Sequence, residues 1–121
     1  MDVVENKGPL AGVKILDLTT VVMGPYATQI LGDMGADIVK VESPAGDNMR
    51  WVGPMKNPGM GHIYLHANRN KRSLVLDLKQ AEGRAAILKL AAVSDVRPHV
   101  VHQHVRHRRQ FQNRFTALGL F

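Results

Sequence analysis

The segment from Val13 to Glu42 constrains the fold most strongly, because it contains the pattern of a strand, a helix and a second strand. VKILDL, residues 13–18, is apolar on successive positions, as in a strand buried on both faces. ADIVKVE, residues 36–42, returns to an extended pattern. Between them, residues 25–35 carry apolar side chains at helical spacing and end in a suitable glycine: Ala27, Ile30, Leu31, Met34 and Gly35. The sequence therefore predicts a βαβ unit with a right-handed crossover.

A second unit follows a long connection. Residues 43–62, SPAGDNMRWVGPMKNPGMGH, have three prolines and four glycines and predict a long loop, a kind of segment that is often functional. KRSLVLDL, residues 71–78, predicts a third strand, and residues 79–95 predict a helix. That helix has one apolar side made of Ala81, Ala85, Leu88 and Ala92. We expect an α/β, Rossmann-like fragment with at least three parallel strands and two packed helices, ending near Ser94.

The net charge of +6 lies mainly at one end of the chain. Residues 95–121 contain five arginines and one acid, which leaves +2 for the first 94 residues. The absence of cysteine excludes disulfides and thiol catalysis. No run approaches the ~20 apolar residues of a membrane span, and the first residues do not resemble a secretory signal. We therefore expect a soluble, cytoplasmic protein with no membrane partner.

The βαβ unit raises the alternative of dinucleotide binding, which requires a Gly-x-Gly-x-x-Gly turn. The turn here has Gly24 at the helix start and Gly32 eight residues later, so that motif is absent. Glu42 ends the second strand where a ribose-binding acid would lie, although acidic residues are common at strand ends. We expect Gly24 and Glu42 to be turn residues.

The order and spacing of the blocks are more specific than any one of them. The chain reads GPLAGVKILDLTTVVMGPYATQILGDMGADIVKVESPAGDNMR and later NRNKRSLVLDLKQAEGRAAILKLAAVSDV. From about Gly8 to Val96 it closely resembles the start of the family III CoA-transferases, which include carnitine, bile-acid and formyl-CoA transferases and α-methylacyl-CoA racemases. The resemblance implies that residues 1–96 are the N-terminal part of a Rossmann-like CoA-binding domain, truncated from a longer chain that forms interlocked homodimers. It also implies an acyl-CoA and a carboxylic acid as substrates.

Two groups of residues match family positions that line the CoA nucleotide: Val22 and Met23, and Leu76, Asp77, Leu78 and Lys79. A strand end followed by a helix N-terminus offers N–H groups and a positive dipole to an anion, and Lys79 can approach a phosphate. Leu76 and Leu78 are equally compatible with core packing. Ser43 departs from the family, because many members have arginine there. We expect Lys71 and Arg72 to be a solvated pair before the third strand.

No residue of this chain inherits a catalytic role from the resemblance. The transferases form an anhydride on an aspartate, and the racemases use a His and an Asp as acid and base; both kinds of group lie later in the family chain. Five aspartates in the matched blocks are expected to be turn or capping residues: Asp17, Asp33, Asp37, Asp77 and Asp95. We expect a CoA-transferase fragment that is inactive alone. A racemase fragment and a non-catalytic CoA-binding or dimerising module remain alternatives.

The last segment, residues 97–121, begins RPHVVHQHVRHRRQF and has neither helical nor strand periodicity. Its histidines are spaced by three, two and three positions and could bind zinc, copper or nickel, but no nearby acid could orient them: His99, His102, His104 and His107. Its arginines, with Phe111 and Phe115, could contact nucleic acid. We favour neither a metal nor a nucleic-acid site. We interpret the segment as an irregular, non-family tail that arose by a frame slip, divergent splicing or a gene-model error.

Overall fold

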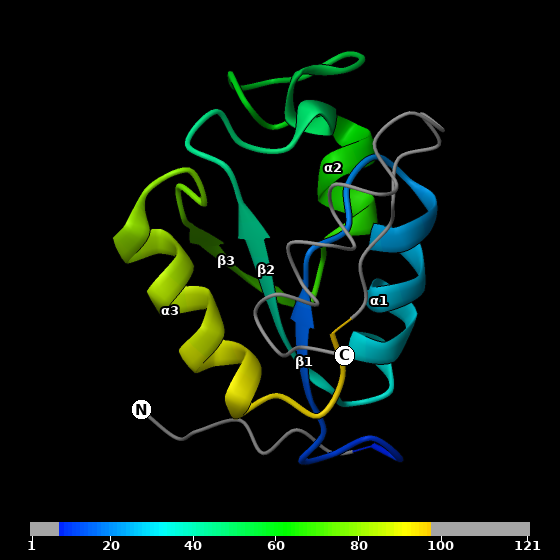
Figure 1. Ribbon diagram of the computed structural model, residues 1–121. Helices are drawn as coiled ribbons and strands as arrows, with labels where there is room; N and C mark the ends of the chain where they lie inside the picture. Colours follow the sequence, from blue (N-terminus) through cyan, green and yellow to red (C-terminus); the bar gives the residue numbers. More distant parts are fainter. Residues whose placement is uncertain (1–7, 98–121) are drawn as a thin grey trace, which may run out of the picture.

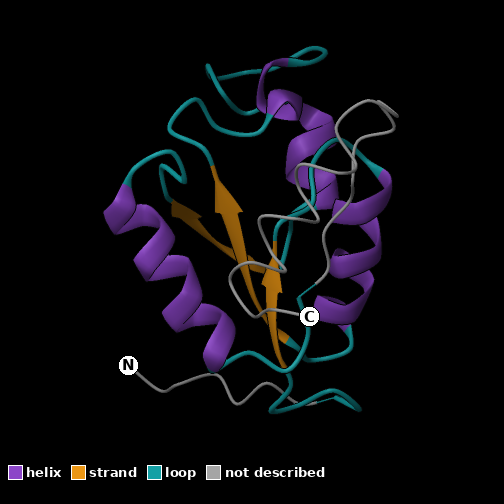
Figure 2. Ribbon diagram, viewed as in Figure 1, coloured by secondary structure: helices purple, strands orange, loops and turns teal. Residues whose placement is uncertain are grey.

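The computed structural model describes residues 8–97, which form an open parallel sheet with helices on both faces (Figures 1 and 2). The predicted α/β, Rossmann-like class with parallel strands is confirmed. The elements in chain order are β1 (Lys14–Asp17), α1 (Met23–Asp33), β2 (Asp37–Glu42), the 3-10 helix η1 (Asn48–Trp51), α2 (His62–Ala67), β3 (Lys71–Val75) and α3 (Ala81–Ala92).

β2 lies at the centre of the sheet, paired in parallel with β1 and with β3. On the other edge of β1, Ile15 forms an isolated parallel bridge with Val96, and the Leu16 N–H donates to the Val96 carbonyl oxygen at 2.9 Å. After α3 the chain therefore crosses to the far side of β1. Ligands of open α/β sheets bind beyond the carboxyl ends of the strands at such a reversal, which here lies at β1.

The core is divided between the two faces of the sheet because successive strand residues point to opposite sides. Ile15 and Ile38 pack with Ala36 and Leu31 on the face covered by α1. Leu16 and Val41 belong to a second cluster with Ala91 of α3, on the opposite face. Figure 1 shows α1 and α2 on one side of the sheet and α3 on the other.

α1 does not bury the apolar face that its sequence predicts. Ile30 is 38% exposed and Met34 is 43% exposed, whereas Leu31 packs against the core. The helix instead turns small and polar residues toward the sheet. The Thr28 hydroxyl donates to the buried Asp17 carboxylate at 2.6 Å, which fixes this rotation. The buried residues are Pro25, Thr28, Gln29 and Gly32.

The predicted face of α3 is also wrong. Gly83 and Ala91 are buried, and Ile87 and Leu90 pack against the core cluster. Gly83 decides the orientation, because a Cβ atom there would lie 2.1 Å from the Asp77 carbonyl oxygen. Only glycine allows α3 to approach the preceding turn this closely. The exposed or partly exposed residues include the predicted set, Ala81, Ala85, Leu88 and Ala92.

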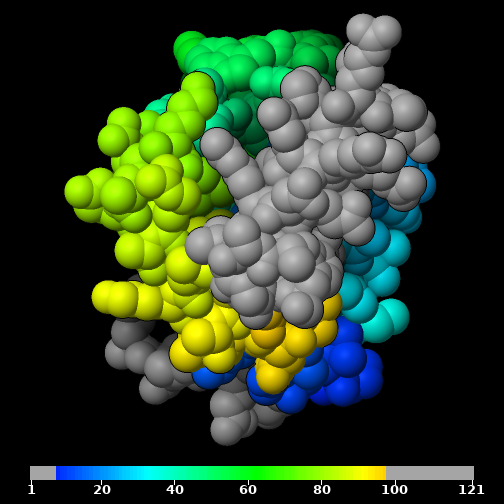
Figure 3. Space-filling model, viewed as in Figure 1, coloured from blue at the N-terminus to red at the C-terminus, as the bar shows by residue number. Residues whose placement is uncertain are grey.

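The connection between β2 and β3 is more ordered than a long loop. It contains η1 and ends in α2, which the sequence analysis missed because six residues are too few to show a helical period. The Gly61 N–H donates to the Arg50 carbonyl oxygen at 2.8 Å, so the start of α2 is tied to η1. Figure 3 shows the green residues of this connection forming one end of the molecule.

Among the described residues, no helix has the length and apolarity needed to cross a bilayer. The tail that the sequence predicts to be irregular, with its four histidines, lies outside the described residues apart from Arg97.

Candidate functional site

The carboxyl ends of β1, β2 and β3 meet at one edge of the sheet, and the candidate CoA residues lie there (Figure 1). Val22 lies between β1 and α1, Met23 is the first residue of α1, and residues 76–79 follow β3. Adjacent strands are ~4.8 Å apart, so the turns after β1 and β3 lie roughly 10 Å apart. The Leu76 N–H donates to the Glu42 carbonyl oxygen at 2.9 Å, so the chain after β2 leaves the sheet beside the chain after β3.

The β1–α1 turn, residues 18–22, leads into the N-terminus of α1, which has no side-chain cap. Val21 has a φ of 70°, a left-handed conformation that is rare for a β-branched residue. Val22 precedes the helix without a capping side-chain hydrogen bond, and the first helical turn has no acidic residue. Met23 is 77% exposed. Such a terminus stabilises negative charge, since its first N–H groups have no intrahelical acceptor.

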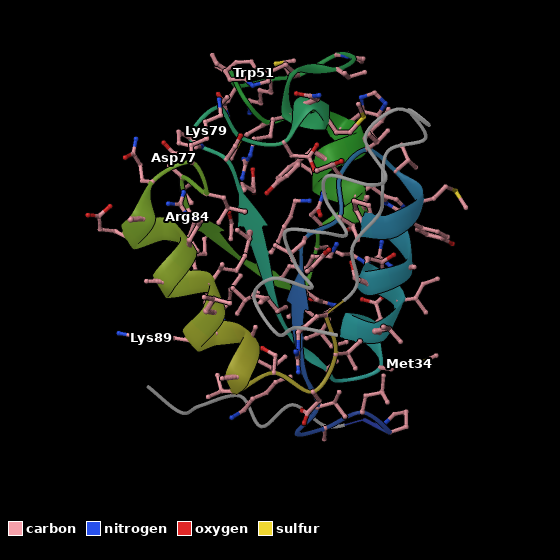
Figure 4. The ribbon with its side chains drawn as sticks, in the orientation of Figure 1. Met34, Trp51, Asp77, Lys79, Arg84 and Lys89 are labelled. Atoms are coloured by element: carbon pink, nitrogen blue, oxygen red, sulfur yellow. The ribbon has the colours of Figure 1, made fainter. Side chains whose placement is uncertain are left out.

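The β3–α3 turn, residues 76–80, is built by its own polar side chains. Asp77 Oδ1 accepts the Lys79 N–H at 2.9 Å, so Asp77 is a turn residue. Arg84 donates to the carbonyl oxygens of Leu78 and Lys79 at 3.2 and 2.7 Å. The Lys79 side chain is exposed at the same end of the molecule as Asp77 and the exposed Trp51 (Figure 4).

Leu76 and Leu78, each of which the sequence allows either in the core or in contact with a ligand, have different environments in the structure. Leu76 packs against the cluster that contains Leu16 and Ala91. Leu78 is 41% exposed and remains available at the edge of the sheet. The candidate residues are thus brought to one edge, but Leu76 belongs to the core.

A buried ion pair lies directly behind the β1–α1 turn. Lys71 Nζ is 3.0 Å from Asp17 Oδ2, and the two side chains are 1% and 0% exposed. The predicted solvated pair is therefore wrong for Lys71, although Arg72 is 69% exposed and pairs with Asp37. Lys71 is buried because its side chain points under α1, where it also donates to the Pro25 carbonyl oxygen at 2.7 Å.

Opposing effects determine the pKa values of this pair. Burial by itself raises the pKa of Asp17, but hydrogen bonds from Thr19 and Thr28 and the charge of Lys71 bring it below its usual value. Burial lowers the pKa of Lys71, and the charge of Asp17 only partly offsets this. Asp17 is therefore a carboxylate that holds the turn, as the sequence predicts for a turn or capping residue.

Glu42 is bonded to protein groups through both carboxylate oxygens. Oε1 accepts from Arg50 Nη2, the Tyr64 hydroxyl and the Ser73 hydroxyl at 2.8, 2.6 and 2.8 Å. Oε2 accepts from Arg50 Nε and the Asp47 N–H at 2.7 and 2.9 Å. Burial raises the pKa of Glu42, but the hydrogen bonds, that from Arg50 foremost, bring it down to about 2. This carboxylate is not free to bind a ribose, which removes the main support for the dinucleotide alternative.

The sequence pattern alone does not indicate the cluster around Glu42. The Arg50 guanidinium pairs with the Glu42 carboxylate and also lies 3.8 Å from the centre of the Tyr64 ring. Arg50 therefore joins the loop to α2. The available signal was three charged residues, Glu42, Asp47 and Arg50, in a segment rich in proline and glycine. The Tyr64 contact could not be foreseen, because α2 was not predicted.

No cluster of three or more potential metal ligands exists within residues 8–97. The four histidines of the tail lie outside that range, so the expectation for them stays a prediction.

Comparison with known proteins gives matches over most of the chain. The model of CoA-transferase family III matches residues 10–114. Human succinyl-CoA:glutarate CoA-transferase is 51% identical over 92 residues, covering 75% of this chain and 21% of that protein. Succinyl-CoA:mesaconate CoA-transferase of Haloarcula hispanica is 47% identical over 93 residues, covering 74% of this chain and 24% of that protein. The chain thus spans about a fifth to a quarter of the length of these curated relatives.

The fold has solved counterparts. A CAIB/BAIF family protein from Brucella suis superimposes with a TM-score of 0.75 and 35% sequence identity, covering 94% of this chain and 29% of that one. The family match continues past Val96, where the sequence predicts a domain boundary. Residues 98–121 are outside the described range, so that boundary stays a prediction.

Proposed function

The chain belongs to CoA-transferase family III, and on that premise we propose that residues 8–97 are part of the CoA-binding domain of an enzyme that transfers CoA between carboxylic acids. The substrates would be an acyl-CoA and a carboxylic acid. Relatives named for succinyl-CoA support succinyl-CoA as the donor, and their names favour transfer over racemisation.

One observation carries this proposal: the uncapped N-terminus of α1 lies at the point where the strand order reverses. In this proposal the N–H groups around Val22 and Met23 bind phosphate oxygens of CoA. Lys79 supplies a positive charge from the neighbouring turn, and Leu78 supplies exposed apolar surface. Asp77 shapes that turn, and Leu76 supports it from the core.

The described part of the chain supplies no catalytic residue in this proposal. A nucleophilic aspartate needs a carboxylate that can reach the acyl group. The aspartates of residues 8–97 are each bonded to protein groups instead: Asp17 to Lys71, Asp33 to Arg69, Asp37 to Arg72, Asp47 to Lys40, Asp77 to the Lys79 N–H and Asp95 to the Lys14 N–H. The 121-residue chain would then bind CoA without transferring it.

Homodimerisation, which the family resemblance implies, is part of the proposal. The outer side of α1 exposes apolar side chains, Met23, Tyr26, Ile30 and Met34, at helical spacing. Soluble monomers seldom expose such a continuous apolar row, so contact with further polypeptide is expected there.

Isothermal titration of the purified chain with CoA and with duplex DNA, each at two salt concentrations, tests the proposal. We expect saturable CoA binding, and DNA binding that is absent or weaker than CoA binding at both salt concentrations. Binding of DNA that falls steeply with salt, with no heat from CoA, would replace the proposal by nucleic-acid binding through the basic tail.

A further inference from the structure

We propose that Lys40 and Lys71, two buried lysines of β2 and β3, are positioning residues that set the conformation of the β1–α1 turn and thereby the affinity of that turn for CoA. The inference rests on the proposed function and deepens it, because it names the side chains that shape the phosphate-binding part of the site.

Lys71 fixes the far end of the turn. Its ammonium group donates to Asp17 Oδ2 at 3.0 Å, to the Pro25 carbonyl oxygen at 2.7 Å and to Asn68 Oδ1 at 3.0 Å. An ammonium group has three donors, so these three acceptors satisfy it fully. Because Pro25 belongs to the first turn of α1, Lys71 holds the start of this helix against the end of β1.

Lys40 fixes the near end. Its ammonium group donates to the Thr19 carbonyl oxygen at 2.9 Å, and Thr19 lies between β1 and α1. The same group lies 2.8 Å from Asp47 Oδ2, with both side chains 1% exposed. Asp47 Oδ2 has no hydrogen-bond partner within residues 8–97, so the ion pair with Lys40 is its polar contact there. Lys40 therefore connects the turn after β1 to the loop after β2.

The consequence is that carbonyl oxygens at both ends of the turn point inward to buried cations. Asp17 completes the arrangement, because it accepts the Thr19 N–H at 2.9 Å and the Thr28 hydroxyl at 2.6 Å. Val21, between the fixed points, has a φ of 70°, a conformation that persists only where its surroundings impose it. The carbonyl oxygens thus place less negative charge at the carboxyl ends of the strands. The first N–H groups of α1, which have no side-chain cap within residues 8–97, then give this part of the surface its positive potential.

Fold stability alone does not explain these buried charges. Apolar residues of similar volume often replace a buried ion pair without loss of stability, so such a pair is weak evidence for a stabilising role. Both lysines also donate to backbone carbonyl oxygens: Lys40 to Thr19 in the β1–α1 turn, and Lys71 to Pro25 at the start of α1. We therefore infer that the specific role of the two lysines is to hold the β1–α1 turn in its conformation.

The test uses the full 121-residue chain with the neutral pair Asp17→Asn and Lys71→Met. The readouts are the thermal unfolding midpoint, the amide resonances of Val21, Val22 and Met23, and the Kd for CoA. We expect a folded protein in which these resonances shift and the Kd rises about tenfold, the loss expected when a charge-assisted hydrogen-bond network is removed. The matched control is D37N/R72M, which neutralises an exposed ion pair between β2 and β3 and should change neither the turn resonances nor the Kd.

Each outcome decides the inference. A folded D17N/K71M protein with wild-type turn resonances would overturn it, as would wild-type CoA affinity in a protein whose wild type binds CoA. If the wild type binds no CoA, the proposed function fails, and the turn resonances alone decide the positioning role. If D17N/K71M does not fold, K40M/D47N replaces it with the same expected shifts. Failure of both pairs to fold would also overturn the inference, because the lysines would then support the whole fold.

Discussion

Glu42 shows how one side chain can hold a long connection in place. Glu42 is 4% exposed, and its carboxylate joins the end of β2 to Arg50 in η1, Tyr64 in α2 and Ser73 in β3. Hydrogen bonds to an ionised acceptor are stronger than those between neutral groups. The segment between β2 and β3 is therefore fixed by a buried charge more than by regular secondary structure.

This bonding predicts an acid-dependent stability. The pKa of Glu42 is about 2 in the folded chain, below the ordinary value of 4.5, so protonation favours the unfolded state. The contribution of Glu42 is present above the ordinary pKa and is lost as the pH falls from about 5 to 2. Urea unfolding between pH 7 and pH 3 should show this decrease in the free energy of unfolding.

Glu42→Gln tests the source of that pH dependence. The variant should be less stable at pH 7 by roughly 2 kcal/mol, since the half-buried Arg50 loses its carboxylate partner. It should also lose much of the acid dependence, leaving the parts that Asp17 and Asp33 contribute through their own lowered pKa values. A slope equal to that of the wild type would mean that other carboxylates cause it.

At the scale of elements, α1 and α3 do not turn their most apolar side toward the sheet. Specific close contacts with the sheet or the preceding turn set the rotation of each helix instead. In α1, Thr28 turns toward the buried Asp17 carboxylate, and Ile30 remains partly exposed. In α3, Gly83 lies against the Asp77 carbonyl oxygen. Hydrophobic periodicity identifies such helices correctly but selects the wrong face, because it carries no information on where a buried polar group needs a partner.

Gly83→Ala tests the contact between α3 and its preceding turn. In an ordinary helix interior this change stabilises by ~1 kcal/mol. Here we expect destabilisation of about 1–3 kcal/mol, because the added Cβ atom would meet the Asp77 backbone. Ala85→Gly, at an exposed position of α3, is the control and should cost ~1 kcal/mol. Thermal unfolding of the three proteins gives the comparison, and a stabilised G83A would contradict the assigned contact.

The sequence predicts the three strands, their parallel direction and the two long helices, because these features depend on local patterns. It also brings Val22 and Lys79 to one edge, since the carboxyl ends of parallel strands share an edge. It does not predict that Lys71 is buried, because the burial depends on Asp17, 54 residues away. Nor does it predict α2, whose six residues are held by contacts with η1.

At the scale of the whole molecule, the chain covers 21% of the human relative that it matches at 51% identity. We expect the purified chain to show no CoA transfer from succinyl-CoA to carboxylic acid acceptors, and no exchange of the α-proton of a 2-methylacyl-CoA in heavy water. Mass spectrometry of the CoA esters measures both. Turnover that disappears on replacing one of the described aspartates by alanine would show that the site contains its own nucleophile.

The most direct test of CoA binding at the carboxyl edge is a titration of the ¹⁵N-labelled chain with CoA, followed by amide chemical shifts. We expect saturable shifts at Val22, Met23, Leu78 and Lys79, which lie at the start of α1 and in the turn after β3, at the carboxyl ends of the strands. Amides near Asp37, at the opposite ends of the strands, should not move. The absence of shifts at high CoA concentration, or shifts confined to the region of Asp37, would contradict CoA binding at the carboxyl edge.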